Sequence, residues 1–152
     1  MADAVEEHGG GLAGWLATET IRIEAGIPRF CAEMNQNTLP PEANIESRAI
    51  RYSKGCYIGQ EIIARIRTYG KVNRTLIGFR LDAMLAESVT PGTSLVDESN
   101  KAVATITSVT DSPKFGPIAL GLAKRTHAEP GQSLSVQSPD RGQATIVSLP
   151  FG

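Results

Sequence analysis

The chain has 152 residues, of which 41% are hydrophobic and 20% are charged, and its formal net charge is −1. This length allows one domain or two small ones with a buried core, and the charge argues against broad attraction to nucleic acid or anionic membranes. Two cysteines and two histidines without a C-x-x-C pair exclude a zinc site of the usual spacing within one chain, so no metal site is predicted. No apolar run is as long as a membrane span, which needs about 18 residues. The start of the sequence also lacks a signal-peptide pattern. We therefore expect a reducing, cytoplasmic environment.

The N-terminal third predicts a few short elements. Residues 1–11 are acidic and glycine-rich, which predicts a disordered leader. Apolar side chains at i, i+3 and i+4 from Leu12 predict a short helix over residues 12–19. Alternation of isoleucine with charged residues predicts a strand at 21–24, and a second short strand is predicted within 45–53.

A helix is also predicted directly after the stretch KGCYIGQE, which occupies residues 54–61. Apolar residues recur at helical spacing after Gly59, and Gly70 suits the position that ends a helix. Arg65 and Arg67 fall on the opposite side and predict a solvated face.

The sequence changes character at Val72, where short β-rich runs alternate with turn signals. Six strands at this spacing predict a small antiparallel β-barrel, so the fold class is α+β with a boundary near Lys71 and two parts, 12–71 and 72–152. The six runs are RTLIGFRL, TSLVD, AVATITSV, IALGLA, QSLSVQS and QATIVSLPF.

Cys56 is the residue that points most directly to chemistry. A neighbouring cation, Lys54, and the start of a helix both favour the thiolate form of a cysteine. Gly55 and Gly59 allow the backbone to turn tightly and to present its N–H groups. The competing interpretation is a small buried hydrophobic residue in a glycine-rich turn.

The other candidate side chains carry weaker signals. No histidine stands beside Cys56, because His8 is in the leader and His127 is predicted on the surface between the fourth and fifth strands. This weakens the case for a Cys–His hydrolase. Cys31 stands near Met34 and is predicted to be a packed, inert thiol.

KGCYIGQE resembles the signature of the YgfZ family, which are folate-binding proteins linked to iron–sulfur cluster assembly and repair. These proteins are relatives of the glycine-cleavage T-protein, the aminomethyltransferase. The resemblance extends to RIEAGIPRF, NTLPPEA and ARIRTYGKVNR, and the tail is similar to the C-terminal barrel of that superfamily. Two departures stand out: family members carry another domain's worth of chain before RIEAG, and Cys31 occupies the place of a usual glycine. The chain is therefore expected to be a C-terminal portion.

The resemblance implies roles for individual residues. It implies that Glu24 accepts hydrogen bonds from the pterin ring of tetrahydrofolate, and that Arg51 faces the anionic glutamate tail. It places Cys56 and Lys54 at the reactive centre. Gly55, Tyr57, Gly59, Gln60 and Glu61 complete the motif. Binding by this chain alone is expected to be weak or absent, because the rest of the folate cavity belongs to the preceding domain.

The main functional interpretation is thus a tetrahydrofolate-binding accessory protein that supports iron–sulfur proteins through Cys56. One thiolate cannot hold a cluster alone, so a partner protein or second chain is implied. The alternatives are a folate-dependent aminomethyltransferase and a non-catalytic interaction module. The tail of a sarcosine or dimethylglycine dehydrogenase is disfavoured, because this chain has no G-x-G-x-x-G nucleotide-binding segment.

Overall fold

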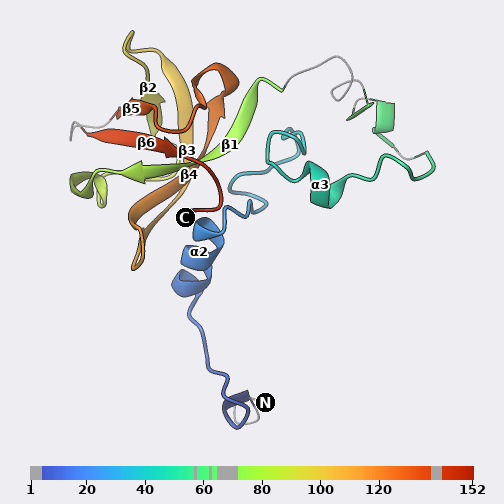
Figure 1. The fold of residues 1–152 in the computed structure, drawn as a ribbon, viewed down its shortest axis with the longest axis horizontal. Helices are drawn as coiled ribbons and strands as arrows, with labels where there is room; N and C mark the ends of the chain where they lie inside the picture. The colour runs from blue at the N-terminus through green and yellow to red at the C-terminus, as the bar shows by residue number, and fades with distance from the viewer. Residues whose placement is uncertain (1–4, 57, 62, 65–71, 138–141) are drawn as a thin grey trace.

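The computed structural model describes residues 5–56, 58–61, 63–64, 72–137 and 142–152 (Figure 1). Its main body is a closed antiparallel barrel with the strand order β1-β4-β3-β2-β5-β6. This confirms the barrel predicted from Val72 onward. The strands are β1 (Arg74–Leu81), β2 (Ser94–Val96), β3 (Ala102–Ser112), β4 (Gly116–Lys124), β5 (Ser133–Val136) and β6 (Gln143–Val147), with short 3-10 helices η1 (Ala83–Leu85) and η2 (Arg125–His127).

The barrel closes around one apolar core. Buried and exposed residues alternate along β5 and β6, so every second side chain points inward. The closed arrangement gives each strand a hydrogen-bonded neighbour on both sides over part of its length. The largest fully buried side chains of this core are Phe79, Leu85, Leu95, Ile106, Leu134 and Ile146.

A second apolar cluster lies outside the barrel, over β1 and β4. Leu76, Ile118 and Leu120 point outward and are buried beneath Ile23 and Phe151. The outer side chains can pack closely here because Gly78 of β1 has no side chain: a Cβ atom at this position would lie 2.8 Å from the Phe151 ring. These contacts fix both an N-terminal helix and the C-terminal end of the chain to the barrel wall.

That N-terminal helix is α2 (Trp15–Glu24), and it corrects two predictions. The predicted helix over residues 12–19 begins later, at Trp15. The predicted strand at 21–24 is wrong, because these residues form the last turn of α2. Ile23 is the only buried residue of the helix, and the polar residues around it bond to β3, so tertiary contacts outweigh the β-preference of isoleucine. Gly26 ends the helix with a φ of 64°.

The segment between α2 and the barrel holds a further correction. The predicted strand within 45–53 is wrong, because Glu46–Ala49 form α3, a short helix of exposed or half-buried residues. A helix after Gly59 is present as far as the described residues reach: the Ile63 N–H donates to the Gly59 carbonyl at 3.3 Å. The rest of that predicted helix, with Arg65, Arg67 and Gly70, lies outside the described residues.

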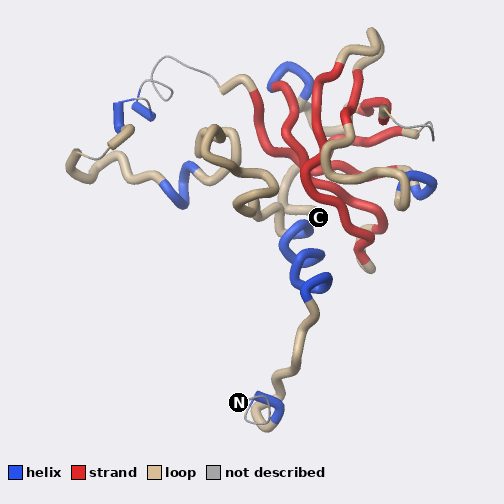
Figure 2. Tube along the Cα trace, turned by 180° about the vertical axis from the view of Figure 1, so that it is seen from behind, coloured by secondary structure: helices blue, strands red, loops and turns tan. Residues whose placement is uncertain are grey.

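The two views show how these parts are arranged. α2 stands against the barrel wall beside the C-terminus, while the chain beyond α3 runs away from both (Figures 1 and 2). Within the described ranges, no helix combines the length and apolar character required to cross a bilayer.

Candidate functional site

The Cys56 motif lies on an exposed part of the chain. The side chains of Lys54 and Cys56 are exposed and Cys56 is a free thiol, so the buried alternative for this cysteine is wrong. Gly59 adopts a φ of 89°, a conformation that suits glycine, and the helix starts at Gln60 directly after it. Tyr57 lies outside the described residues. The geometry therefore presents an accessible thiol just before a helix, and its chemical role stays a prediction.

Cys31 differs from the prediction of a packed thiol, because its side chain is exposed. Its φ of 68° places it in the left-handed region, in a turn closed by a 2.8 Å hydrogen bond from the Cys31 N–H to the Met34 carbonyl. Glycine adopts this conformation without steric cost, whereas a Cβ atom is crowded there. The turn thus has the backbone conformation of a glycine position, occupied here by cysteine.

Glu24, the residue implied in pterin binding, is held in place by the barrel. It is the last residue of α2 and half-buried, and its Oε1 accepts a 2.6 Å hydrogen bond from the Ser112 hydroxyl. The Ser112 oxygen in turn accepts the N–H groups of Lys114 and Phe115 at 3.1 and 3.0 Å. Because the Ser112 oxygen accepts both of these N–H groups, its hydroxyl proton is directed at the Glu24 carboxylate. The Glu24 carbonyl also accepts the Phe151 N–H at 2.9 Å, so three segments of the chain converge on this residue.

The structure does not bring the expected site residues together. Arg51 is exposed in the segment after α3, which also carries the Cys56 motif. This segment runs away from the barrel in both views, whereas Glu24 ends the helix that packs on the barrel (Figures 1 and 2). Glu24 on one side and Cys56 with Arg51 on the other therefore form two separate places on the described chain.

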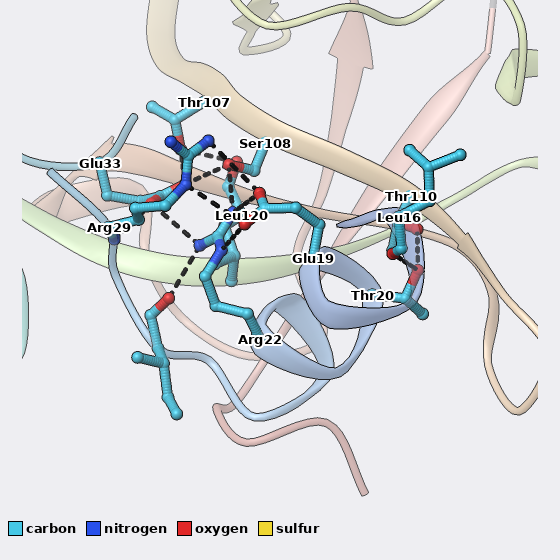
Figure 3. Close-up of polar contacts among 11 residues, drawn as sticks. Leu16, Glu19, Thr20, Arg22, Arg29, Glu33, Thr107, Ser108, Thr110 and Leu120 are labelled. Carbon is cyan, nitrogen blue, oxygen red and sulfur yellow. Dashed lines mark hydrogen bonds and ion pairs between the residues drawn. The ribbon is translucent and has the colours of Figure 1, made fainter. Parts of the chain in front are cut away.

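Next to Glu24 lies a buried polar network that the sequence analysis missed (Figure 3). Glu33 is 1% exposed, and its carboxylate forms a 3.0 Å ion pair with Arg22. Thr107 and Ser108 of β3 donate their hydroxyls to the same carboxylate. Arg22 also donates to Ser108 at 2.8 Å, so the helix and the turn after it are both tied to β3.

Further polar contacts extend this network. Arg22 pairs with Glu19 at 2.9 Å, and this hydrogen bond is the main reason that the pKa of Glu19 lies below its usual value of 4.5. The Thr20 and Thr110 hydroxyls share a 2.7 Å hydrogen bond. The partners of α2 come from β3, far along the chain, so no local sequence pattern indicates them.

His127 occupies the place predicted for it between β4 and β5, where it is half-buried with Nε2 3.6 Å from Asp97. The pKa of Asp97 is lowered, chiefly by the backbone N–H of Lys101, which makes the carboxylate a stable acceptor in this turn. Within the described ranges, no group of three or more His, Cys, Asp or Glu side chains has the arrangement needed to hold a metal ion.

Comparisons with known proteins agree on one architecture. Residues 74–151 match the family described as the glycine cleavage T-protein C-terminal barrel domain. The chain is 34% identical to an aminomethyltransferase of Saccharopolyspora erythraea, over 99% of this chain and 41% of the relative. It is 30% identical to one of Chlorobium chlorochromatii, over 99% of this chain and 39% of the relative. The crystal structure of a glycine cleavage system aminomethyltransferase T from Bartonella henselae superposes with a TM-score of 0.79 at 20% identity, over 90% of this chain and 38% of that chain.

Two conclusions follow from these matches. The superposition on the Bartonella protein shows a shared fold, and at 20% identity it shows the fold alone. The chain spans about two fifths of the length of these curated relatives, 41% for the protein of S. erythraea and 39% for that of C. chlorochromatii.

Proposed function

Because this chain belongs to the family of the glycine cleavage T-protein C-terminal barrel domain, we propose that it serves as the C-terminal part of a tetrahydrofolate-binding protein built like an aminomethyltransferase. The observation that carries the proposal is the fixed carboxylate of Glu24. Ser112 holds one oxygen of this carboxylate, and the end of α2 and the C-terminal segment hold its backbone.

Such a carboxylate suits the edge of a pterin ring. This edge presents a ring N–H beside an exocyclic amine, and a carboxylate accepts both in parallel, the geometry of strong bidentate pairs. Ser112 donates to Oε1 while its oxygen accepts two N–H groups, so the carboxylate is held ready to accept further N–H groups. Glu24 is thereby pre-organised, which lowers the entropic cost of binding.

Glu24 provides one wall of a binding site, and the chain alone is proposed to bind tetrahydrofolate weakly. The test is a chimera that joins this chain to the part of the S. erythraea aminomethyltransferase outside the aligned region. Calorimetric titration should show tetrahydrofolate binding by the chimera. Glu24→Ala should weaken it about 10- to 100-fold, because a lost charge-assisted contact costs roughly 1.5–3 kcal/mol.

Two results would overturn this assignment. The matched control is Glu98→Ala, which removes an exposed carboxylate from the turn before β3, at the opposite end of that strand from Ser112, and should leave the affinity unchanged. Equal losses for Glu24→Ala and Glu98→Ala would remove Glu24 from the site. Tight binding by the chain alone would show that its pocket is complete without the added part.

Of the two activities considered for this architecture, aminomethyl transfer is favoured by the two curated relatives named above, since both are aminomethyltransferases. In that case the folate nitrogen accepts the methylene group, and no protein thiol is required. The chimera should then release ammonia from an aminomethylated carrier protein only when tetrahydrofolate is present. No ammonia above the rate without tetrahydrofolate would exclude transfer.

One observation favours the second candidate, the support of iron–sulfur proteins typical of the YgfZ branch. Cys56 is an exposed free thiol in the motif KGCYIGQE, and methylene transfer to folate does not require a protein thiol. A thiolate is a soft ligand for iron and an attacking group in disulfide exchange. Exposed free thiols at Cys31 and Cys56 suit the reducing cytoplasm, which is the proposed location.

A complementation experiment separates the two candidates. The chimera is expressed in cells that lack their own YgfZ-type factor, and the activity of a cluster-dependent enzyme is measured. Cys56→Ser should abolish the rescue, while Cys31→Ser, the other exposed thiol, should keep it. Full rescue by Cys56→Ser would show that the thiol has no part in the function.

A further inference from the structure

Another place on the barrel, whose lining includes neither Cys56 nor Glu24, has the features of a binding site. An open cavity of about 890 Å³ lies where β1 begins and β4 ends. This volume falls within the range of about 300–1,000 Å³ of small-molecule pockets. Its walls are Glu42, Val72, Asn73, Arg74, Lys124, Arg125 and Thr126.

The charges around this cavity are unbalanced. Arg74 and Lys124 are directly opposed in the β1–β4 register, and Arg125 follows Lys124 in the chain. Like charges at opposed positions of an antiparallel pair destabilise the sheet. The lining contains a single carboxylate, that of the buried Glu42, and it lies 3.6 Å from the Arg74 guanidinium.

The other two cations that line the cavity are Lys124 and Arg125. Lys124 donates one of its three ammonium protons to the Ala102 carbonyl at 2.9 Å, a neutral acceptor that leaves the charge uncompensated. Arg125 is exposed, and its backbone is fixed by a 3.1 Å hydrogen bond to the Asn73 carbonyl. The chain as a whole carries a charge of −1, so this concentration of positive charge is local.

We propose that the cavity between β1 and η2 binds a compact multivalent oxyanion, whose phosphate or carboxylate groups bridge Lys124 and Arg125. A guanidinium fork matches two oxygens of either group, and an ammonium adds a point charge beside it. Asn73 and Thr126 supply neutral polar groups at the rim. A bound anion would also relieve the repulsion between the opposed Arg74 and Lys124. The site is independent of the proposed folate function, since it uses neither Glu24 nor Cys56.

The test uses the chain itself, with two probes that distinguish the possible sources of the anion. Pyrophosphate represents phosphates, and a pentaglutamate peptide represents polycarboxylates. Calorimetric titration at low salt should show saturable binding of one of them, weakening as salt screens the charges. Tighter pyrophosphate binding assigns the site to phosphates, and tighter peptide binding assigns it to polycarboxylates.

Variants locate the binding. Lys124→Gln and Arg125→Gln should each weaken it about two- to five-fold, the range of single exposed ion pairs, and about tenfold together. Lys101→Gln removes a lysine outside the cavity and is the matched control. In the anion-free chain, Lys124→Gln should raise the melting temperature, because it removes one of two opposed cations. No saturable binding of either probe, or an equal loss for Lys101→Gln, would overturn the proposal.

Discussion

Replacing Arg22 with methionine is expected to release α2 from the barrel. The Arg22 guanidinium contacts Glu33 at 3.0 Å, Glu19 at 2.9 Å and the Ser108 hydroxyl at 2.8 Å, and its side chain is only 10% exposed. Methionine fills a similar volume but leaves the buried Glu33 carboxylate without its cation. The perturbation thus removes a charge pair while changing packing little.

The size of the effect follows from the burial of Glu33. Breaking a buried ion pair by removing one partner costs about 3–5 kcal/mol, because the remaining charge stays in a medium of low polarity. Glu33 keeps the hydroxyls of Thr107 and Ser108 and the N–H of Arg29 as donors, which partly offset the loss. We therefore expect a loss of about 3 kcal/mol, at the lower end of this range.

Urea denaturation with two probes measures this loss. Trp15, the only tryptophan, lies in α2 under the Arg29 guanidinium, so its fluorescence reports the helix and its surroundings. Far-UV circular dichroism reports mainly the barrel. In Arg22→Met the fluorescence transition should move to lower urea by more than the dichroism transition, because the barrel core does not include Arg22.

A double variant provides the control. Arg22→Met with Glu33→Gln contains no buried charge, and the glutamine can still accept from the neighbouring hydroxyls, so it should be more stable than Arg22→Met alone. A loss below about 1 kcal/mol for Arg22→Met, the level of an exposed ion pair, would refute the reasoning. A double variant less stable than the single one would refute it as well.

Four further predictions concern the same face and the two thiols. Cys31→Gly should raise the free energy of unfolding by about 1 kcal/mol in a denaturant titration, since it relieves a left-handed residue; a lower value would contradict the strain at a φ of 68°. The pKa of Glu19 is below 4.5, so its contribution to stability is full above about pH 4.5 and is lost as the pH falls through the lowered pKa; Glu19→Gln should therefore flatten the acid side of a plot of melting temperature against pH. At neutral pH Cys56 should be alkylated faster than Cys31, as measured by peptide mass spectrometry, because a cation and a helix start adjoin it; equal rates would argue against an activated thiol. In the chimera, Ser112→Ala should weaken tetrahydrofolate binding and Ser112→Thr should restore it, while unchanged binding in Ser112→Ala would show that Glu24 needs no positioning.

The barrel could be predicted from the sequence because its signals are local. Turn residues separate every pair of strands, and each strand overlaps one of the short β-rich runs. The run RTLIGFRL coincides with β1 from Arg74 to Leu81. What the runs do not indicate is the neighbour order, in which β1 pairs with β4 and β6, because pairing depends on closure of the whole barrel.

The N-terminal part was harder to predict because its contacts are distant in sequence. Ile21 and Ile23 look like a strand, yet the chain there is helical because the partners of its polar residues lie on β3. Glu33 bonds to Thr107 and Ser108, which are 74 and 75 residues further on. A buried glutamate in a polar loop gives no periodic signal, so this network could only be found in three dimensions.

The residues of the candidate site also differ in how far the sequence alone predicts their setting. The sequence leaves Cys56 open between a reactive and a buried thiol, and its exposure removes the buried alternative, while the left-handed turn at Cys31 agrees with the glycine that the resemblance implies there. The support of Glu24 by Ser112 could not be predicted, because the serine ends β3 and meets the helix only after the barrel has closed.

The contacts that α2 and the C-terminal segment make with the barrel bear on the role of the barrel. A barrel that only braced a neighbouring domain would need apolar contacts, and Ile23 with Phe151 already supplies them. The hydrogen bonds from β3 go further, because Ser112 determines where the Glu24 carboxylate points and the buried Glu33 pair fixes the last turn of α2. The two N–H groups that Ser112 accepts belong to the turn between β3 and β4, and its proton is the part of this motif that is directed at the Glu24 carboxylate. Under the proposal that Glu24 binds tetrahydrofolate, the barrel orients this carboxylate, and an interaction module without a ligand is the weaker alternative.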